Sequence, residues 1–189
     1  GGTRGLYFRD TRLISAWELS VNGKPWTLLN SGAVAGSAGR VYFTNPELRS
    51  GGDVIPAHAL GFIFGRRIEG GMHEDIDIVN HGAQTVQSDL ALTISGAFAD
   101  LFAVTAPKVT RRGKVVSDWQ ERHQTLITSY RNKDFGRAFR VAAKNAQSPL
   151  SLANGSLRFA IELAPGENWH TCLFYDFADG DTWSPAPTL

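Results

Sequence analysis

Cysteine is nearly absent from this chain, because Cys172 is the only one among 189 residues. An intramolecular disulfide is therefore excluded, and nothing points to an oxidising compartment. Cys172 lies in the apolar run HTCLFYDF, where a buried, unreactive thiol is expected rather than a nucleophile. No apolar run approaches the roughly 18 residues of a membrane-spanning helix, and no signal-peptide pattern opens the chain. We therefore expect a cytoplasmic protein without a membrane partner.

An excess of one charge sign is also missing. The chain has 19 Lys and Arg against 18 Asp and Glu, which gives a net charge of +1. A domain that binds nucleic acid usually carries a strongly basic surface, so no nucleic-acid partner is expected. The local basic run of Arg111, Arg112 and Lys114 flanks Gly113 and is interpreted as a solvated turn.

Helical periodicity is scarce, and alternation of apolar and polar residues dominates. The segment FADLFAV places Phe98, Leu101 and Phe102 at helix-like spacing, which predicts at most one helical turn. Many short alternating runs separated by Gly, Pro and Asn predict an all-β protein with few or no helices, a sandwich or a barrel. Of these two we expect an antiparallel β-sandwich. At 189 residues the chain can bury a sizeable core without disulfides.

Four segments carry the strand pattern most clearly. WELSVNGKPW predicts a hairpin that turns at Asn22–Gly23. Residues 73–95 are interpreted as a second hairpin turning at NHGA, and residues 125–144 as two strands joined between Asn132 and Gly136. In the last segment, two rows are expected to face one core. The rows are Leu157, Phe159, Ile161 and Leu163, then Trp169, Thr171, Leu173, Tyr175 and Phe177.

Two segments have the composition of loops or linkers. SGAVAGSAGR, residues 31–40, is predicted to be a mobile loop of small residues. The C-terminal GDTWSPAPTL has linker composition. We therefore expect one β-sandwich domain over residues 1–178, and a linker-like tail over residues 179–189 that leads toward a further domain.

The acidic run GMHEDIDIVN does not predict a metal site. His73, Asp75 and Asp77 share one face of a strand, but at about 3.3 Å per residue they spread over about 13 Å. Zinc bonds are only about 2 Å long. Asp75 and Asp77 are about 6.6 Å apart on that face, which falls in the range of inverting glycosidases, yet two acids side by side on an open strand do not flank a sugar. A solvated strand face is the better interpretation.

Motifs for nucleophilic or phosphate chemistry are missing as well. The chain has no G-x-S-x-G, and GSAGR does not match the phosphate-binding loop G-x-x-x-x-G-K-[ST]. We therefore predict no catalytic residue, no metal and no cofactor in this chain.

Five tryptophans remain as candidates for sugar platforms. Trp17 and Trp169 lie on apolar rows and are expected in the core. Trp119, in VSDWQERHQ, has polar neighbours on both sides and can stack on a sugar or on another domain, because its ring is amphipathic.

The opening stretch RGLYFRDTR combines apolar residues with a polar cluster of Arg9, Asp10, Thr11 and Arg12. In an extended strand Asp10 and Arg12 share a side and can meet or share a partner. A guanidinium group can form bidentate hydrogen bonds to carboxylates and backbone carbonyls. We interpret this cluster as one that either orders the fold or lies at an interface between domains.

Three segments resemble a known family: GLYFRDTRLISAWELSVNGKPW, RRIEGGMHEDIDIVNHG and FADLF. They are similar, in order and spacing, to the N-terminal domain of bacterial glycogen debranching enzyme-like proteins, the amylo-α-1,6-glucosidase group. The resemblance covers residues 5 to about 177.

The resemblance implies a supersandwich-like N-terminal domain followed by a helical (α/α)-barrel that carries the glycosidase acid and base. The chain would then be a non-catalytic module whose partner is that helical domain of the same polypeptide, with α-glucan as a further partner. Arg9, Asp10, Arg12, His73 and Glu74 become candidates for ordering the fold or docking the helical domain.

Two alternatives stay open. A freestanding carbohydrate-binding module for α-glucans would expose an aromatic platform such as Trp119. An independent hydrolase would use Asp75, Asp77 or His73.

Overall fold

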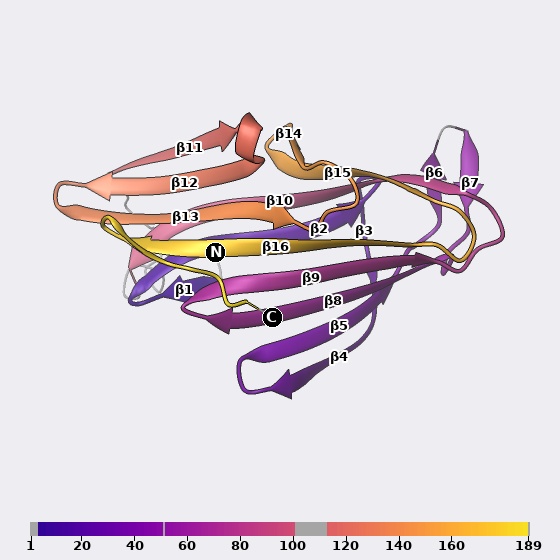
Figure 1. Ribbon diagram of the computed structural model, residues 1–189, viewed down its shortest axis with the longest axis horizontal. Coiled ribbons are helices and arrows are strands. Elements are labelled where there is room, and N and C mark those ends of the chain that lie inside the picture. The colour runs from indigo at the N-terminus through magenta and orange to yellow at the C-terminus, as the bar shows by residue number, and fades with distance from the viewer. Residues whose placement is uncertain (1–3, 51, 101–112, 189) are drawn as a thin grey trace.

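The protein is a sandwich of two antiparallel β-sheets, which confirms the predicted all-β fold (Figure 1). The computed structural model describes residues 4–50, 52–100 and 113–188. Their one helical element is a single 3₁₀ turn, η1 (Glu121–His123). Among these residues there is no helix of the length and apolar character needed to cross a membrane.

The small sheet has six strands in the order β1-β2-β10-β15-β14, with β3 paired to β2. Its strands are β1 (Leu6–Phe8), β2 (Thr11–Val21), β3 (Lys24–Pro25), β10 (Val86–Asp100), β14 (Ser151–Ala153) and β15 (Ser156–Leu163).

The large sheet has nine strands in the order β11-β12-β13-β16-β9-β8-β5-β4, with β17 paired to β16. Its strands are β4 (Thr27–Ala35), β5 (Ala38–Thr44), β8 (Leu60–Glu69), β9 (Gly71–Asn80), β11 (Lys114–Gln120), β12 (Thr125–Asn132), β13 (Phe135–Lys144), β16 (Asn168–Asp179) and β17 (Thr182–Ser184). A separate ribbon pairs β6 (Leu48–Ser50) with β7 (Asp53–Ile55).

The core lies between the inner faces of the two sheets. The apolar rows predicted on β15 and β16 are both buried, as expected, although they belong to different sheets. Phe159 of β15 meets Trp169 of β16 with ring centroids 5.1 Å apart. Alternation along each strand therefore supplies one wall of the core per sheet.

The Asn22–Gly23 hairpin and the hairpin over residues 125–144 are confirmed. Asn22 and Gly23 have φ angles of 47° and 73°, as a tight turn of this type requires. The opening stretch is also a hairpin rather than one extended strand. Arg9 and Asp10 form the turn between β1 and β2, and Arg9 has a φ of 50°.

The predicted hairpin over residues 73–95 is wrong. β9 pairs with β8 and β16 in the large sheet, whereas β10 pairs with β2 and β15 in the small sheet. The buried Asn80 side chain holds this crossing, because its Nδ2 donates to the carbonyls of Gln84 and Leu163 at 2.8 and 3.0 Å. Its Oδ1 accepts from the Gly82 N–H at 2.9 Å. The chain therefore crosses from the large sheet to the small sheet between β9 and β10, where the alternation of apolar and polar residues predicts a hairpin within one sheet.

The predicted mobile loop over residues 31–40 is also wrong. These residues form most of the β4–β5 hairpin, which turns at Gly36 with a φ of 45°. Small side chains do not prevent pairing, since the hydrogen bonds of a sheet come from the backbone.

The expected helical turn at FADLF lies partly outside the described residues. Phe98 belongs to β10, and its ring stacks on Tyr130 and Phe139 at centroid distances of 5.8 and 6.0 Å. Leu101 and Phe102 lie outside the described residues, as do Arg111 and Arg112.

Part of the C-terminal tail lies against the large sheet. Thr182–Ser184 form β17, and the Arg140 guanidinium lies 4.7 Å from the centre of the Trp183 ring. The Ala186 N–H donates to Asp176 at 2.7 Å. The domain boundary at residue 178 stays a prediction.

Candidate functional site

A buried polar network, formed by Glu74, Arg66, Tyr175 and Trp17, joins the two sheets near one end of the sandwich. Glu74 has no exposed surface. Arg66 lies directly opposite it on β8 and donates through Nε and Nη2 to Glu74 Oε1 at 2.8 and 2.6 Å. The Tyr175 hydroxyl donates to Glu74 Oε2 at 2.6 Å. Three donors thus converge on one buried carboxyl group.

Trp17 extends the buried network to the small sheet. Its Nε1 donates to the Tyr175 hydroxyl at 3.1 Å, and the Arg66 guanidinium lies 4.8 Å from the centre of its ring. Burial raises the pKa of Glu74, and Arg66 and Tyr175 oppose this shift. Burial and the nearby Glu74 raise the pKa of Tyr175. Both Glu74 oxygens and the Tyr175 hydroxyl are paired, and the Trp17–Tyr175 hydrogen bond links the two sheets.

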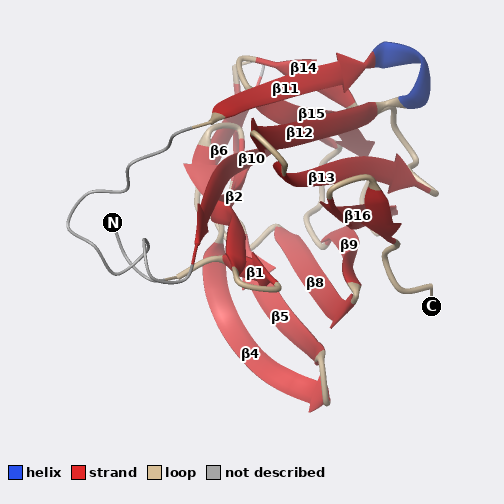
Figure 2. Cartoon of the chain, turned by 90° about the vertical axis from the view of Figure 1, so that its left-hand side faces the viewer, coloured by secondary structure: helices blue, strands red, loops and turns tan. Residues whose placement is uncertain are grey.

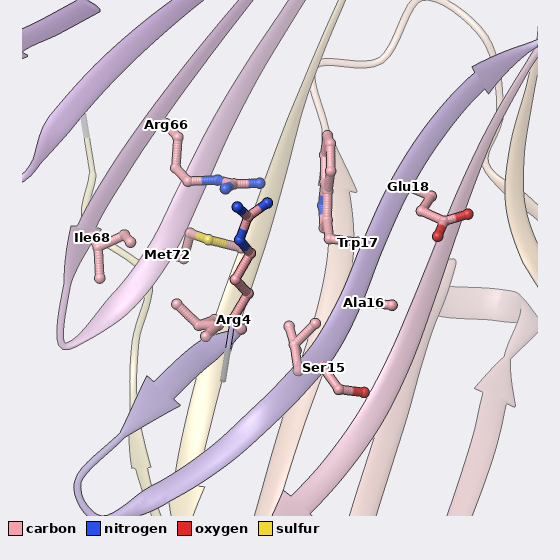
Figure 3. Close-up of a pocket in the computed structure, with 11 residues that line it drawn as sticks. Arg4, Ser15, Ala16, Trp17, Glu18, Arg66, Ile68 and Met72 are labelled. Carbon is pink, nitrogen blue, oxygen red and sulfur yellow. The ribbon is translucent and has the colours of Figure 1, made fainter. Parts of the chain in front are cut away.

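A hollow of about 550 Å³ opens beside the buried network. Figure 3 shows the guanidinium groups of Arg4 and Arg66 in this hollow, with Trp17 alongside. Ile68 and Met72 contribute apolar side chains to its lining. Glu18 is the one carboxylic acid among the described lining residues. Two cations beside an aromatic ring suit the binding of carbonyl or anionic groups. The hollow lacks a pair of facing acids for glycoside hydrolysis.

The polar cluster predicted at the start of the chain is divided in the structure. Arg9 and Asp10 are exposed in the turn, and Arg9 forms an ion pair with Asp179 of β16. Arg12 is 9% exposed and donates through Nη1 to the Arg4 carbonyl at 3.4 Å. The ion pair of Arg9 thus joins the β1–β2 turn to β16, and the hydrogen bond of Arg12 joins β2 to the residues before β1.

His73 and Glu74, adjacent in sequence, lie on opposite faces of β9. Glu74 enters the core, whereas His73 is on the outer face and stacks on Phe174 with ring centroids 4.4 Å apart. Glu74 thus belongs to the buried network, while His73 belongs to a second group of polar residues, and a fold-ordering or docking role for either residue stays a prediction.

That second group, here called the outer-face cluster, comprises His73, Asp75 and Asp77 of β9 with His170 and Cys172 of β16. Asp75 lies opposite Cys172, and Asp77 opposite His170. The Cys172 thiol donates to Asp75 Oδ1 at 3.3 Å. His170 joins Asp77 Oδ1 through Nδ1 at 2.8 Å.

Burial, reinforced by Asp75, raises the pKa of the Cys172 thiol to about 12, and burial lowers the pKa of His73. Cys172 is 1% exposed, as expected of a buried thiol. Sequence reasoning considered only the ligands of β9 and missed the outer-face cluster, because the cluster depends on the β9–β16 register. The alternation of both strands is visible in the sequence, but their pairing is not.

The hydrolase hypothesis finds little support in this geometry. Asp75 and Asp77 lie side by side on the outer face of one strand, as predicted, and each is engaged by a neighbour on β16. Two carboxylates placed in this way cannot act on opposite sides of a glycosidic bond.

Trp119 is partly buried against the core, and its Nε1 donates to Glu121. Its ring therefore offers only part of its surface for stacking. A sugar contact at Trp119 stays a prediction.

The fold and the buried network define a class of protein: an all-β sandwich domain with a buried acid in a polar network that reaches both sheets. The chain belongs to the family described as the N-terminal domain of (some) glycogen debranching enzymes, whose sequence profile matches residues 1–174. The resemblance seen in the sequence is thereby confirmed.

Other comparisons add little about function. No curated protein sequence matches the chain. A crystal structure of heparinase III is similar, with a TM-score of 0.43 and 11% sequence identity. The match covers 89% of this chain and 28% of that heparinase chain.

Proposed function

We propose that this chain is the non-catalytic N-terminal β-sandwich of a glycogen debranching-type glycosidase, and that it packs on a helical catalytic domain and shapes the access of glucan. The observation that carries the proposal is an inner sheet face that the small sheet does not cover, in a chain whose family is described as an N-terminal domain.

The uncovered surface, here called the wing face, consists of Leu28, Ser31 and Ala33 of β4 with Ile68 of β8. Leu28 pairs with Phe43, which pairs with the core residue Phe62, so Leu28 lies on the inner face of the large sheet. Figure 2 shows β4 and β5 continuing the large sheet past β1.

Leu28 is 58% exposed and Ile68 is 39% exposed. In a sandwich such inner residues are covered by the opposite sheet. A second domain of the same polypeptide would supply that cover.

The hollow with Arg4 and Arg66 adjoins the wing face through Ile68. A helical barrel presents the carboxyl ends of helices, whose unpaired carbonyls favour cations. An apolar strip beside two guanidinium groups suits such a partner, because interfaces combine apolar contact with Arg anchors. We place the docking of the helical domain on the wing face and the rim of this hollow.

Catalysis is assigned to the helical domain, since Asp75 and Asp77 lie side by side on one strand and the hollow beside the buried network has one acid among its described lining residues, Glu18. The 189-residue chain alone should not release glucose from an α-1,6-branched oligosaccharide. Such release by the chain would contradict the proposal. A cytoplasmic location stays a prediction of the sequence.

Docking is tested in the full-length protein with Leu28→Asp, and Val116→Asp serves as the control. Val116 is 44% exposed on β11, at the opposite edge of the large sheet. Calorimetry should show that Leu28→Asp separates the unfolding of the two domains, while Val116→Asp leaves it coupled. Equal behaviour of the two variants would place the interface elsewhere.

Glucan access is tested by kinetics on the same two variants. If the module shapes access, Leu28→Asp should raise KM for a long branched glucan more than for a short branched oligosaccharide. Unchanged KM ratios would remove this part of the proposal. Quenching of tryptophan fluorescence by malto-oligosaccharide in the isolated chain, abolished in Trp119→Ala, would favour the freestanding carbohydrate-binding module instead.

A further inference from the structure

The outer-face cluster brings three kinds of metal-binding atom together at the centre of the large sheet. His73 Nε2, an Asp75 carboxylate oxygen and Cys172 Sγ all lie within 4.8 Å of one another. These atoms come from two paired strands. The sequence argument against a metal site concerned three residues along one strand, His73, Asp75 and Asp77, and does not apply to a set in which Cys172 of β16 replaces Asp77. The nitrogen, oxygen and sulfur donors are those that zinc and related ions take in proteins.

Two of the three separations among these atoms match those around a tetrahedral ion, and the third, between His73 and Cys172, lies within 4.8 Å. Zinc bonds of about 2.0–2.3 Å at tetrahedral angles place neighbouring donor atoms about 3.3–3.6 Å apart. His73 Nε2 lies 3.4 Å from Asp75 Oδ1, and Cys172 Sγ lies 3.3 Å from the same oxygen. His170 Nε2 lies 3.3 Å from Cys172 Sγ.

An unsatisfied nitrogen points to a missing ligand. His73 is 2% exposed, and its buried Nε2 lies 3.4 Å from Asp75 Oδ1 but forms no hydrogen bond in the part of the chain that the structure describes. Buried polar atoms are nearly always paired, because an unpaired one loses its interaction with water without replacement. A metal ion beside Asp75 and Cys172 would satisfy this nitrogen.

His170 is oriented in the way that metal-binding histidines usually are. Its Nδ1 donates to Asp77 Oδ1 at 2.8 Å, which directs the lone pair of Nε2 toward Cys172. A carboxylate behind a histidine ligand fixes its ring and tautomer. The same arrangement resembles a Cys-His-Asp catalytic triad, but Cys172 is 1% exposed and out of reach of a substrate.

The two nearby cations have other contacts. Arg67 forms an ion pair with Glu69 at 3.0 Å, and the Lys144 ammonium group lies over the Phe174 ring, 4.5 Å from its centre. Asp75 and Asp77 provide the negative charge that a divalent cation requires.

We propose that His73, Asp75 and Cys172 bind one divalent transition-metal ion of the zinc class, with His170 facing the fourth coordination position. The ion links β9 to β16 and thereby clamps the centre of the large sheet. Binding displaces the thiol proton of Cys172, which leaves as the sulfur–metal bond forms. This role is structural and independent of the proposed docking of a catalytic domain.

The test is titration of the EDTA-treated, dialysed chain with Co²⁺ and then Zn²⁺. We expect one Co²⁺ per chain, a thiolate-to-cobalt charge-transfer band, and loss of that band when Zn²⁺ displaces Co²⁺. Absence of the band in the folded wild-type chain would overturn the proposal without reference to any variant.

Variants assign the ligands. Cys172→Ser should abolish the charge-transfer band, and His73→Gln and Asp75→Asn should each weaken Zn²⁺ binding at least about 10-fold. His123→Gln, in the exposed η1 turn, is the matched control and should bind as the wild type does. Zn²⁺ binding that is equally tight in Cys172→Ser and the wild type would refute the site. Circular dichroism establishes that each variant is folded before it is titrated.

Discussion

Replacing Tyr175 with phenylalanine tests whether the buried network holds the two sheets together. The substitution removes one oxygen and keeps the ring, which is fully buried on β16. That oxygen donates to Glu74 at 2.6 Å and accepts from Trp17 Nε1 at 3.1 Å. Tyr175→Phe therefore breaks both hydrogen bonds without creating a large cavity.

The expected loss in the free energy of unfolding is about 2.5–6 kcal/mol. A hydrogen bond to a charged group contributes about 1.5–3 kcal/mol, and a buried N–H left without a partner costs about 1–3 kcal/mol. For a chain of this size each kcal/mol lowers Tm by about 2–4 °C. A loss of 3 kcal/mol therefore lowers Tm by about 6–12 °C.

Urea unfolding followed by tryptophan fluorescence and circular dichroism measures this loss. Tyr42→Phe is the matched control, because Tyr42 is 39% exposed on β5, and it should change stability by no more than about 0.5 kcal/mol. A double-mutant cycle with Trp17→Phe should give a coupling energy above about 0.5 kcal/mol. If Tyr175→Phe is as stable as Tyr42→Phe, the network does not hold the sheets.

Three further predictions concern stability and are measured by the same urea unfolding. A Cβ at Gly71 would lie 2.5 Å from a carbonyl of the adjacent strand, so Gly71→Ala should cost more than about 2 kcal/mol or prevent folding. Gly32→Ala meets nothing within 4 Å and is its control; similar losses would contradict the packing at Gly71. Asn80→Ala breaks three hydrogen bonds at the crossing between sheets and should cost about 2–4 kcal/mol, and a loss below 1 kcal/mol would show that the crossing holds without this side chain. Arg12→Ala should cost more than about 0.5 kcal/mol, and more than Arg9→Ala, whose side chain is 59% exposed; the reverse order would return Arg12 to an ordinary surface role.

Alternation in the sequence predicts which residues face the core, because each strand has one buried side. Ile76 and Ile78 are buried, and Asp75 and Asp77, which alternate with them, are not, as the pattern indicates. Which strands pair is a separate question. Both β9 and β10 are compatible with a hairpin, and only the path of the chain around Asn80 sends them to different sheets.

The outer-face cluster illustrates the same limit for a site. His73 and Asp75 are recognisable in the sequence, but Cys172 lies about a hundred residues away and looks like an ordinary core residue. Pairing in register brings the thiol to the carboxylate. A single sequence does not reveal that register, since nothing near Cys172 specifies its neighbour across the sheet. The prediction of a loop over residues 31–40 failed for another reason. It was based on amino-acid composition, which describes the side chains, whereas strand pairing depends on backbone hydrogen bonds.

β16 lies between β13 and β9 and pairs with both, so it joins the two halves of the large sheet. One half of the large sheet is complete at Asn80 and the other at Lys144, whereas the strand that unites them, β16, spans Asn168–Asp179 and is synthesised after both. During synthesis β9 pairs with β8 on one side, but its other edge stays unpaired until about ninety further residues have been added. Non-local pairing of this kind slows folding, so a chaperone that shields this edge during synthesis should raise the yield of native protein.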